Sequence, residues 1–210
     1  MINRYLLRFF LGWCLLSVTF SVAADENFQS CVAALAKKHG WSAPDAFEHI
    51  VCHGKGIQSI DGIEKYVNVK KLSFHKNKIE KVSLSGFKHL QHINFARNRI
   101  ETIHLAELPE VKEIFLFDNK LTQLELADMP SLQILKANTN ALTAFSYKNL
   151  PKLKKVYLFN NKLEAIDIYH LDSMMYMDVR QNPMPDKLYE EMDALEGVTI
   201  FHDGNAEDWR

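Results

Sequence analysis

The side chains best suited to metal or acid–base chemistry in this sequence are its nine histidines. Four are expected to gather on adjacent strands, His53 and His75 in one outward column with His49 and His92 nearby. A zinc site needs three or four ligands and often includes a carboxylate or a thiolate. The surrounding positions hold Lys71 and Lys76 and no acid. We therefore predict solvated histidines and no metal site.

No catalytic motif accompanies these histidines. The sequence contains no G-x-S-x-G, no phosphate-binding glycine loop and no H-E-x-x-H, and its eight glycines are not clustered. We therefore predict neither an enzyme nor a cofactor. The formal net charge of −1 lacks the basic footprint that nucleic-acid binding requires, so nucleic acid is not expected as a partner.

An internal repeat organises most of the chain. Asparagine recurs every 21 residues, at Asn77, Asn98, Asn119, Asn140, Asn161 and Asn182. Apolar residues precede each asparagine by five and by three positions and follow it by two. This alternation predicts one short strand in each unit, with its apolar side chains inward. The asparagine is expected at the turn, where its amide satisfies backbone groups and forms a ladder from coil to coil.

The rest of each unit is also regular. Apolar pairs such as Val82 with Leu84 and Ile103 with Leu105 alternate, which predicts extended return legs on the convex side rather than helices. Further units are expected at both ends. Ile50 and Cys52 match with a 22-residue step, and Val198, Ile200 and Asp203 continue the 21-residue step, with Asp203 at the asparagine position. The total is eight stacked strands.

An open stack exposes its core at both ends and therefore requires caps. Residues 25–39 read as an amphipathic helix ended by Gly40. Residues 186–195 read as a second, shorter helix that turns Leu188, Met192 and Leu195 inward. Cys31 lies beside the apolar face of the first helix, and Cys52 is inward on the first strand. We predict a Cys31–Cys52 disulfide that ties this cap to the stack, the alternative being two buried thiols.

The repeat units, such as LQHINFARNRIETIHLAELPE, resemble the short bacterial type of leucine-rich repeat. The first unit, GIQSIDGIEKYVNVKKL, is similar to internalin-type repeats, and the resemblance covers about residues 47–203. It implies a leucine-rich-repeat solenoid of the α/β class, dominated by β-structure, with parallel strands on its concave face.

Aromatic side chains occupy outward positions of the later strands. The candidate binding residues are Phe115, Phe117, Lys136, Asn138, Tyr157, Phe159, Tyr176 and Arg180. One column is expected through Phe115, Lys136 and Tyr157, and a second through Phe117, Asn138 and Phe159, with Phe201 extending the second column past Arg180. Exposed aromatics and arginine are typical of interface hot spots. The alternative is that the rings pack on each other and on Lys136 and Arg180 through cation–π contacts.

The N-terminus has the pattern of a secretory signal. Arg4 and Arg8 precede a short apolar run at residues 9–20, and small residues follow at 21–24. The alternative is a membrane anchor, but a span needs about 20 apolar residues. We predict a signal peptide at 1–24, a helical cap at 25–46, repeats at 47–185 and a C-terminal cap with a partial repeat at 186–210. The mature protein is expected to be periplasmic or secreted, without a membrane span.

Together these features predict an exported module that binds a protein partner through its concave face. Carbohydrate is the alternative ligand, because Asn138, Asn160 and Asp178 lie beside the aromatic side chains. A purely structural protein of the cell envelope is the third alternative.

Overall fold

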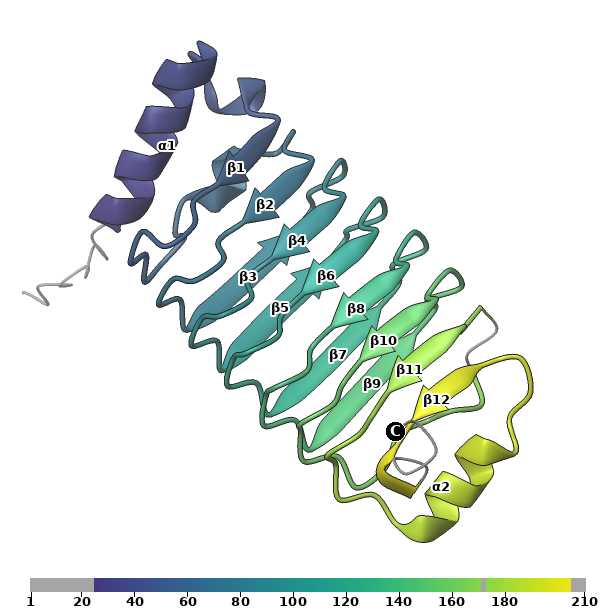
Figure 1. Cartoon of the computed structure of the whole chain (residues 1–210). Helices are drawn as coiled ribbons and strands as arrows, with labels where there is room; N and C mark the ends of the chain where they lie inside the picture. The colour runs from purple at the N-terminus through teal and green to yellow at the C-terminus, as the bar shows by residue number, and fades with distance from the viewer. Residues whose placement is uncertain (1–24, 171–172, 205–210) are drawn as a thin grey trace, which may run out of the picture.

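The computed structural model describes residues 25–170 and 173–204 as a row of stacked coils with a helix at each end (Figure 1). Each coil contributes one short strand to an eight-stranded parallel sheet. In spatial order the strands are β1 (His49–Val51), β2 (Lys71–Ser73), β4 (His92–Asn94), β6 (Glu113–Phe115), β8 (Ile134–Lys136), β10 (Lys155–Tyr157), β11 (Tyr176–Asp178) and β12 (Thr199–Phe201). The predicted eight-stranded stack is confirmed.

The return legs on the opposite side are extended, as the alternation of apolar residues predicted. β3 (Lys81–Ser85) pairs with β5 (Thr102–Ala106), and β7 (Gln123–Ala127) pairs with β9 (Ala144–Lys148), both in parallel. Two short 3-10 helices, η1 (Pro44–Ala46) and η2 (Ile63–Lys65), complete the first coils.

The core fills the space between the two sides of the solenoid. The central residues of the strands, such as Ile93, Ile114 and Leu135, form an inward column that is almost wholly removed from solvent. Alternation along the strand sends every second side chain to this column, and burying each one contributes about 1.5–3 kcal/mol. Phe74 and Phe95 stack in the next inward column with ring centroids 5.3 Å apart.

The predicted asparagine ladder is present in all six repeats. The Asn119 amide illustrates it: its Nδ2 donates to the carbonyls of Phe95 and Leu116, each at 3.0 Å, and its Oδ1 accepts from the backbone N–H of Ile100 at 3.0 Å. One side chain therefore satisfies backbone groups of its own coil and of the preceding coil. The residue before each ladder asparagine has a left-handed backbone, with φ 59° at Asp118.

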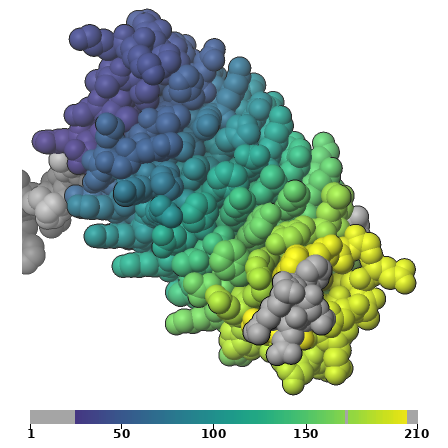
Figure 2. All heavy atoms as spheres, viewed as in Figure 1, coloured from purple at the N-terminus to yellow at the C-terminus, as the bar shows by residue number. Residues whose placement is uncertain are grey.

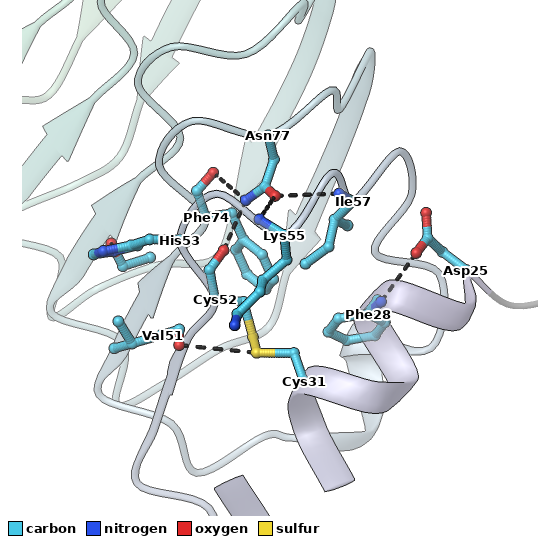
Figure 3. The surroundings of a disulfide bond; sticks show 11 residues. Asp25, Phe28, Cys31, Val51, Cys52, His53, Lys55, Ile57, Phe74 and Asn77 are labelled. Carbon is cyan, nitrogen blue, oxygen red and sulfur yellow. Dashed lines mark hydrogen bonds between the residues drawn. A yellow bond between two sulfur atoms is a disulfide. The ribbon is translucent and has the colours of Figure 1, made fainter. Parts of the chain in front are cut away.

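The N-terminal cap is the helix α1 (Glu26–His39), which Gly40 ends with a left-handed φ of 72°. The Asp25 carboxylate caps the first turn by accepting from Phe28 N–H at 2.9 Å, and it also accepts from Gln58 and Ser59 in the first coil. The predicted disulfide joins Cys31 of α1 to Cys52 beside β1, with the two Cα atoms 6.1 Å apart (Figure 3). The carboxylate and the disulfide both attach the cap to the solenoid.

The last coil differs from the sequence prediction. The registered pairs are Tyr176 with Thr199 and Met177 with Ile200, a step of 23 residues rather than 21. The path through the helix α2 (Asp186–Asp193) accounts for the two extra residues. Asp203 therefore does not occupy the asparagine position; its carboxylate accepts from the N–H of Gln181 at 2.9 Å.

The C-terminal cap packs partly as predicted. Met192 is buried, and Leu188 and Leu195 are partly buried against the core. Tyr189 of α2, which was not predicted to be inward, is also buried. Tyr189 is inward because its ring stacks on the fully buried His202, with centroids 4.7 Å apart. The His202 Nε2 lies 2.9 Å from a carboxylate oxygen of Asp193.

None of the helices in the described part of the chain is long and apolar enough to cross a membrane. The predicted signal peptide at residues 1–24 lies outside the described residues.

Candidate functional site

The concave sheet brings the predicted binding residues together on its C-terminal half. Strand register places Phe115, Lys136, Tyr157, Asp178 and Phe201 side by side in one outward column. The second column lies two residues further along each coil, at Phe117, Asn138, Phe159 and Arg180. Phe201 therefore belongs to the first column. The prediction that it extends the second column was wrong, because it assumed a 21-residue step in the last coil.

The first column and Tyr176 form a continuous layer of rings and cations. Lys136 Nζ lies 5.3 Å from the ring centroid of Phe115 and 5.1 Å from that of Tyr157. Tyr176 links Tyr157 to Phe201, with centroid distances of 5.1 and 5.3 Å. The ring–ring and cation–π contacts that were the alternative explanation for these aromatic residues are thus present. They hold the rings of this column in place.

Phe117 and Phe159 differ from the rings of the first column. Both are half-buried, and within the described residues no aromatic ring or cation stacks on either of them. Asn138 stands between them in the column, and its amide Nδ2 is 3.4 Å from Thr139 Oγ1. Lys136 fills the corresponding place between Phe115 and Tyr157, whereas the shorter Asn138 leaves the two outer rings unbridged. We refer to Phe115, Phe117, Tyr157, Phe159, Tyr176 and Phe201 as the aromatic patch.

Arg180 is fixed at the edge of this patch by an acid. Its Nε and Nη2 donate to the two carboxylate oxygens of Asp178 at 2.9 and 2.7 Å, and its guanidinium lies 5.3 Å from the Phe201 ring centroid. The hydrogen bonds from Arg180 to Asp178 raise the pKa of the arginine above its ordinary value. Burial, followed by the nearby Asp178 charge, raises the pKa of Tyr176. At physiological pH, Arg180 is therefore charged and the Tyr176 hydroxyl is neutral.

The N-terminal half of the concave sheet carries the histidines. The rings of His53 and His75 lie edge to face with centroids 5.7 Å apart, and His53 Nε2 is 2.7 Å from the hydroxyl oxygen of the buried Ser73. Burial, helped by the charges of His75 and Lys71, lowers the pKa of His53. No group of three or more histidine, cysteine or acidic side chains placed to hold a metal ion occurs among the described residues.

Sequence reasoning missed one acid near these histidines. Glu113 lies 3.1 Å from His92 Nδ1, on the next strand of the sheet. The repeat period contained this signal, since the two residues are 21 positions apart. A second missed contact is the packing of Trp41 against His39 and His49, with centroids 4.5 and 5.0 Å apart. Trp41 precedes the repeats, so the repeat period carries no information about this contact.

Stacked coils, an inward apolar column and an asparagine at each turn define a leucine-rich-repeat solenoid. The chain has this fold in common with an internalin (inlF) from Listeria monocytogenes, with a TM-score of 0.53, 18% identity, and coverage of 85% of this chain and 63% of the internalin chain. It also has it in common with the protein of the TLR13–ssRNA13 complex, with a TM-score of 0.55, 19% identity, and coverage of 65% of this chain and 22% of that chain.

This chain therefore spans less than two thirds of either solved protein. At such identities the likeness shows the shared fold alone. No protein-family model matches the sequence, and no curated protein sequence matches it.

Proposed function

We propose that this protein is an exported binding module that recognises a protein partner through the aromatic patch of its concave sheet. The observation that carries the proposal is the position of Phe117 and Phe159. Both rings lie on the solvent side of the sheet, and within the described residues no ring or cation stacks on them. The exposed part of each half-buried ring is costly in water, and covering it with a partner recovers that free energy.

The surroundings of these two rings support the same reading. Lys136 and Arg180 already hold the neighbouring rings, so a partner meets a surface whose side chains lose little freedom on binding. Aromatic residues and arginine are also the types that dominate binding energy at protein interfaces. Phe117 and Phe159 are the expected anchors, and the rings of the first column are the rigid support beside them.

Carbohydrate recognition has less support from this geometry. The polar groups considered for it in the sequence analysis were Asn138, Asn160 and Asp178. Asp178 is 2% exposed and its carboxylate is engaged by Arg180, so it offers no free acceptor to a sugar. A glycan ligand would therefore depend on the two asparagines, one of which already bonds Thr139.

The test compares partner capture and thermal stability in matched variants. Phe117→Ala and Phe159→Ala are expected to lower folding stability by less than about 1 kcal/mol and to weaken binding by about 2 kcal/mol or more. Leu116→Ala, a fully buried control between two outward positions, is expected to cost about 2–5 kcal/mol of stability. A captured protein is then purified and titrated against each variant.

Three results would contradict the proposal. The first is capture that is unchanged in both phenylalanine variants. The second is loss of stability in those variants as large as in Leu116→Ala. The third is displacement of the captured material by a polysaccharide, which would favour the carbohydrate alternative.

Export is the second part of the proposal and is tested separately. The charged and apolar pattern of residues 1–20 supports it, and the expected mature N-terminus is Ala24 or Asp25. N-terminal sequencing of exported protein decides the matter, since an exported chain that still begins with Met1 would contradict cleavage.

A further inference from the structure

Charge is distributed unevenly along the concave sheet. The outward positions on the first three strands and just after them carry a lysine and four histidines, which we call the basic end: His49, His53, Lys71, His75 and His92. No acid occupies an outward position of β1, β2 or β4, all of which lie in the described part of the chain. The whole protein nevertheless has a formal net charge of −1, so its acids are concentrated on other surfaces.

Several of those acids lie on the convex side. Glu107, Glu125 and Asp128 border the groove between β5 and β7 there. In the space-filling view the coils form parallel bands from the purple to the yellow end, so side chains of successive coils line up in rows (Figure 2). A partner lying along the concave rows meets the basic end and the aromatic patch in sequence.

The centre of the basic end is His53 with its neighbours. Its ring points away from the disulfide and the solenoid interior (Figure 3). Its Nε2 is held at 2.7 Å from Ser73 Oγ, and the His75 ring lies edge to face with it. Lys71 is close enough to act electrostatically on His53, and the side chains that act on it are basic. An anionic group placed here would pair with the ammonium of Lys71 and accept hydrogen bonds from imidazole N–H groups.

The remaining acids near the basic end are already occupied or lie at its border. Glu113 pairs with His92 at 3.1 Å, and Asp118 lies 3.7 Å from Arg97 at the turn. Glu48 precedes β1 and acts on His49, which Trp41 and His39 also contact. The region around His53, His75 and Lys71 is therefore left without an acidic partner within the described part of the molecule.

We infer that the protein partner presents an acidic segment, rich in Asp or Glu, to the basic end while its apolar side chains cover the aromatic patch. This inference rests on the proposed function, because it assumes that a protein lies along the concave sheet. Complementary charge across an interface sets the orientation of the partner and accelerates association. The two ends of the sheet thereby define one direction of binding.

The experiment measures binding of a labelled peptide of alternating Glu and Leu to the purified protein, with the same peptide carrying Gln in place of Glu as comparison. The test variant is the double substitution Lys71→Gln/His75→Gln. Its matched control is Lys148→Gln/His104→Gln, which makes the same chemical changes on exposed residues of the convex strands β9 and β5. Phe117→Ala reports on the aromatic patch independently.

The expected result is that the Glu peptide binds about tenfold more tightly than the Gln peptide, and that the test variant removes this difference while the control variant keeps it. Raising the salt concentration should also remove the difference, because exposed charges are screened. The Glu peptide should also bind more weakly to Phe117→Ala, because the bound peptide covers the basic end and the aromatic patch together.

The contrary outcomes separate this inference from the proposed function. Equal binding of the two peptides, with both weakened by Phe117→Ala, would overturn the acidic segment and leave the aromatic patch as a protein-binding surface. No binding of the Glu peptide would also overturn the acidic segment, and partner capture would still test the patch. Tighter binding of a labelled oligo-deoxythymidine than of the Glu peptide would overturn both in favour of a nucleic acid.

Discussion

The carboxylate of Asp178 and the guanidinium of Arg180 form a two-point hydrogen-bonded pair, with 2.9 Å from Nε to Oδ1 and 2.7 Å from Nη2 to Oδ2. The Asp178 side chain is 3% exposed and that of Arg180 is 44% exposed. The pair thus joins a buried acid to a base that reaches the concave surface of the sheet. Asp178 was a candidate for contacting a carbohydrate, and its burial under Arg180 removes it from that role.

Asp178→Ala is therefore expected to affect folding as well as binding. Removing the carboxylate leaves Arg180 without its anchor, and the loss of charged hydrogen bonds should cost about 1.5–3 kcal/mol of stability. Chemical denaturation of this variant measures the loss, with Glu164→Ala as a control that removes an acid from an exposed position. If the two variants unfold at the same denaturant concentration, the pair contributes nothing to stability.

The disulfide gives a second prediction. Cys31 and Cys52 are separated by 21 positions, and closing a loop of this length stabilises the folded chain by about 3 kcal/mol on a chain-entropy estimate. Replacing both with serine should lower the melting temperature and loosen α1 from β1. Binding at the aromatic patch should be retained at temperatures where the variant is folded. A reductant should lower the melting temperature of the natural protein and leave that of the variant unchanged; equal responses would contradict the prediction.

The residues with left-handed backbone that precede the ladder asparagines give a third prediction. Thr139 has φ 55° and Asn160 has φ 56°, and the N–H of each donates to the next coil at 2.9 Å. A β-branched residue is strained in this conformation, whereas asparagine tolerates it. Thr139→Asn should stabilise the protein by about 1 kcal/mol, and Asn160→Thr should destabilise it by a similar amount. Thermal unfolding of both variants checks the two signs, and a shift in the same direction for both would refute the strain argument.

The histidines give a fourth prediction, which concerns the pH dependence of folding stability. Burial is the largest cause that lowers the pKa of both His49 and His53; His75 and Lys71 add to it at His53, and His39, Lys38 and Lys71 add to it at His49 against the opposing charge of Glu48. Because the unfolded chain then binds more protons than the folded one, stability should fall as the pH drops below the ordinary histidine value of about 6.5. Above that pH both states carry neutral imidazoles and the effect is absent.

Melting temperatures measured near pH 7.5 and near pH 5.5 test this sign. His53→Gln, which keeps a polar side chain beside Ser73, should show a smaller decrease than the natural protein. His104→Gln on the convex strand β5 serves as the control and should show the full decrease. A decrease of the same size in all three proteins would mean that His53 is not responsible.

Much of the fold was contained in the sequence because its stabilising contacts repeat. A ladder asparagine bonds carbonyls three residues before it and one coil earlier, so a 21-residue period is sufficient to predict those bonds. Alternation along each strand likewise separated Leu116, which is fully buried, from Phe115 and Phe117. Both inferences depend on distances along the chain that are the same in every coil.

The tertiary structure decided what does not repeat. The path through α2 lengthened the last step by two residues, which moved Phe201 into the first column and buried His202. Alternation assigned Asp178 to the outward side, but it is buried beside Arg180, whose guanidinium lies over the Phe201 ring. Periodicity determines which side of the sheet a residue faces. How far that residue is exposed depends on the sizes and charges of side chains brought beside it by folding.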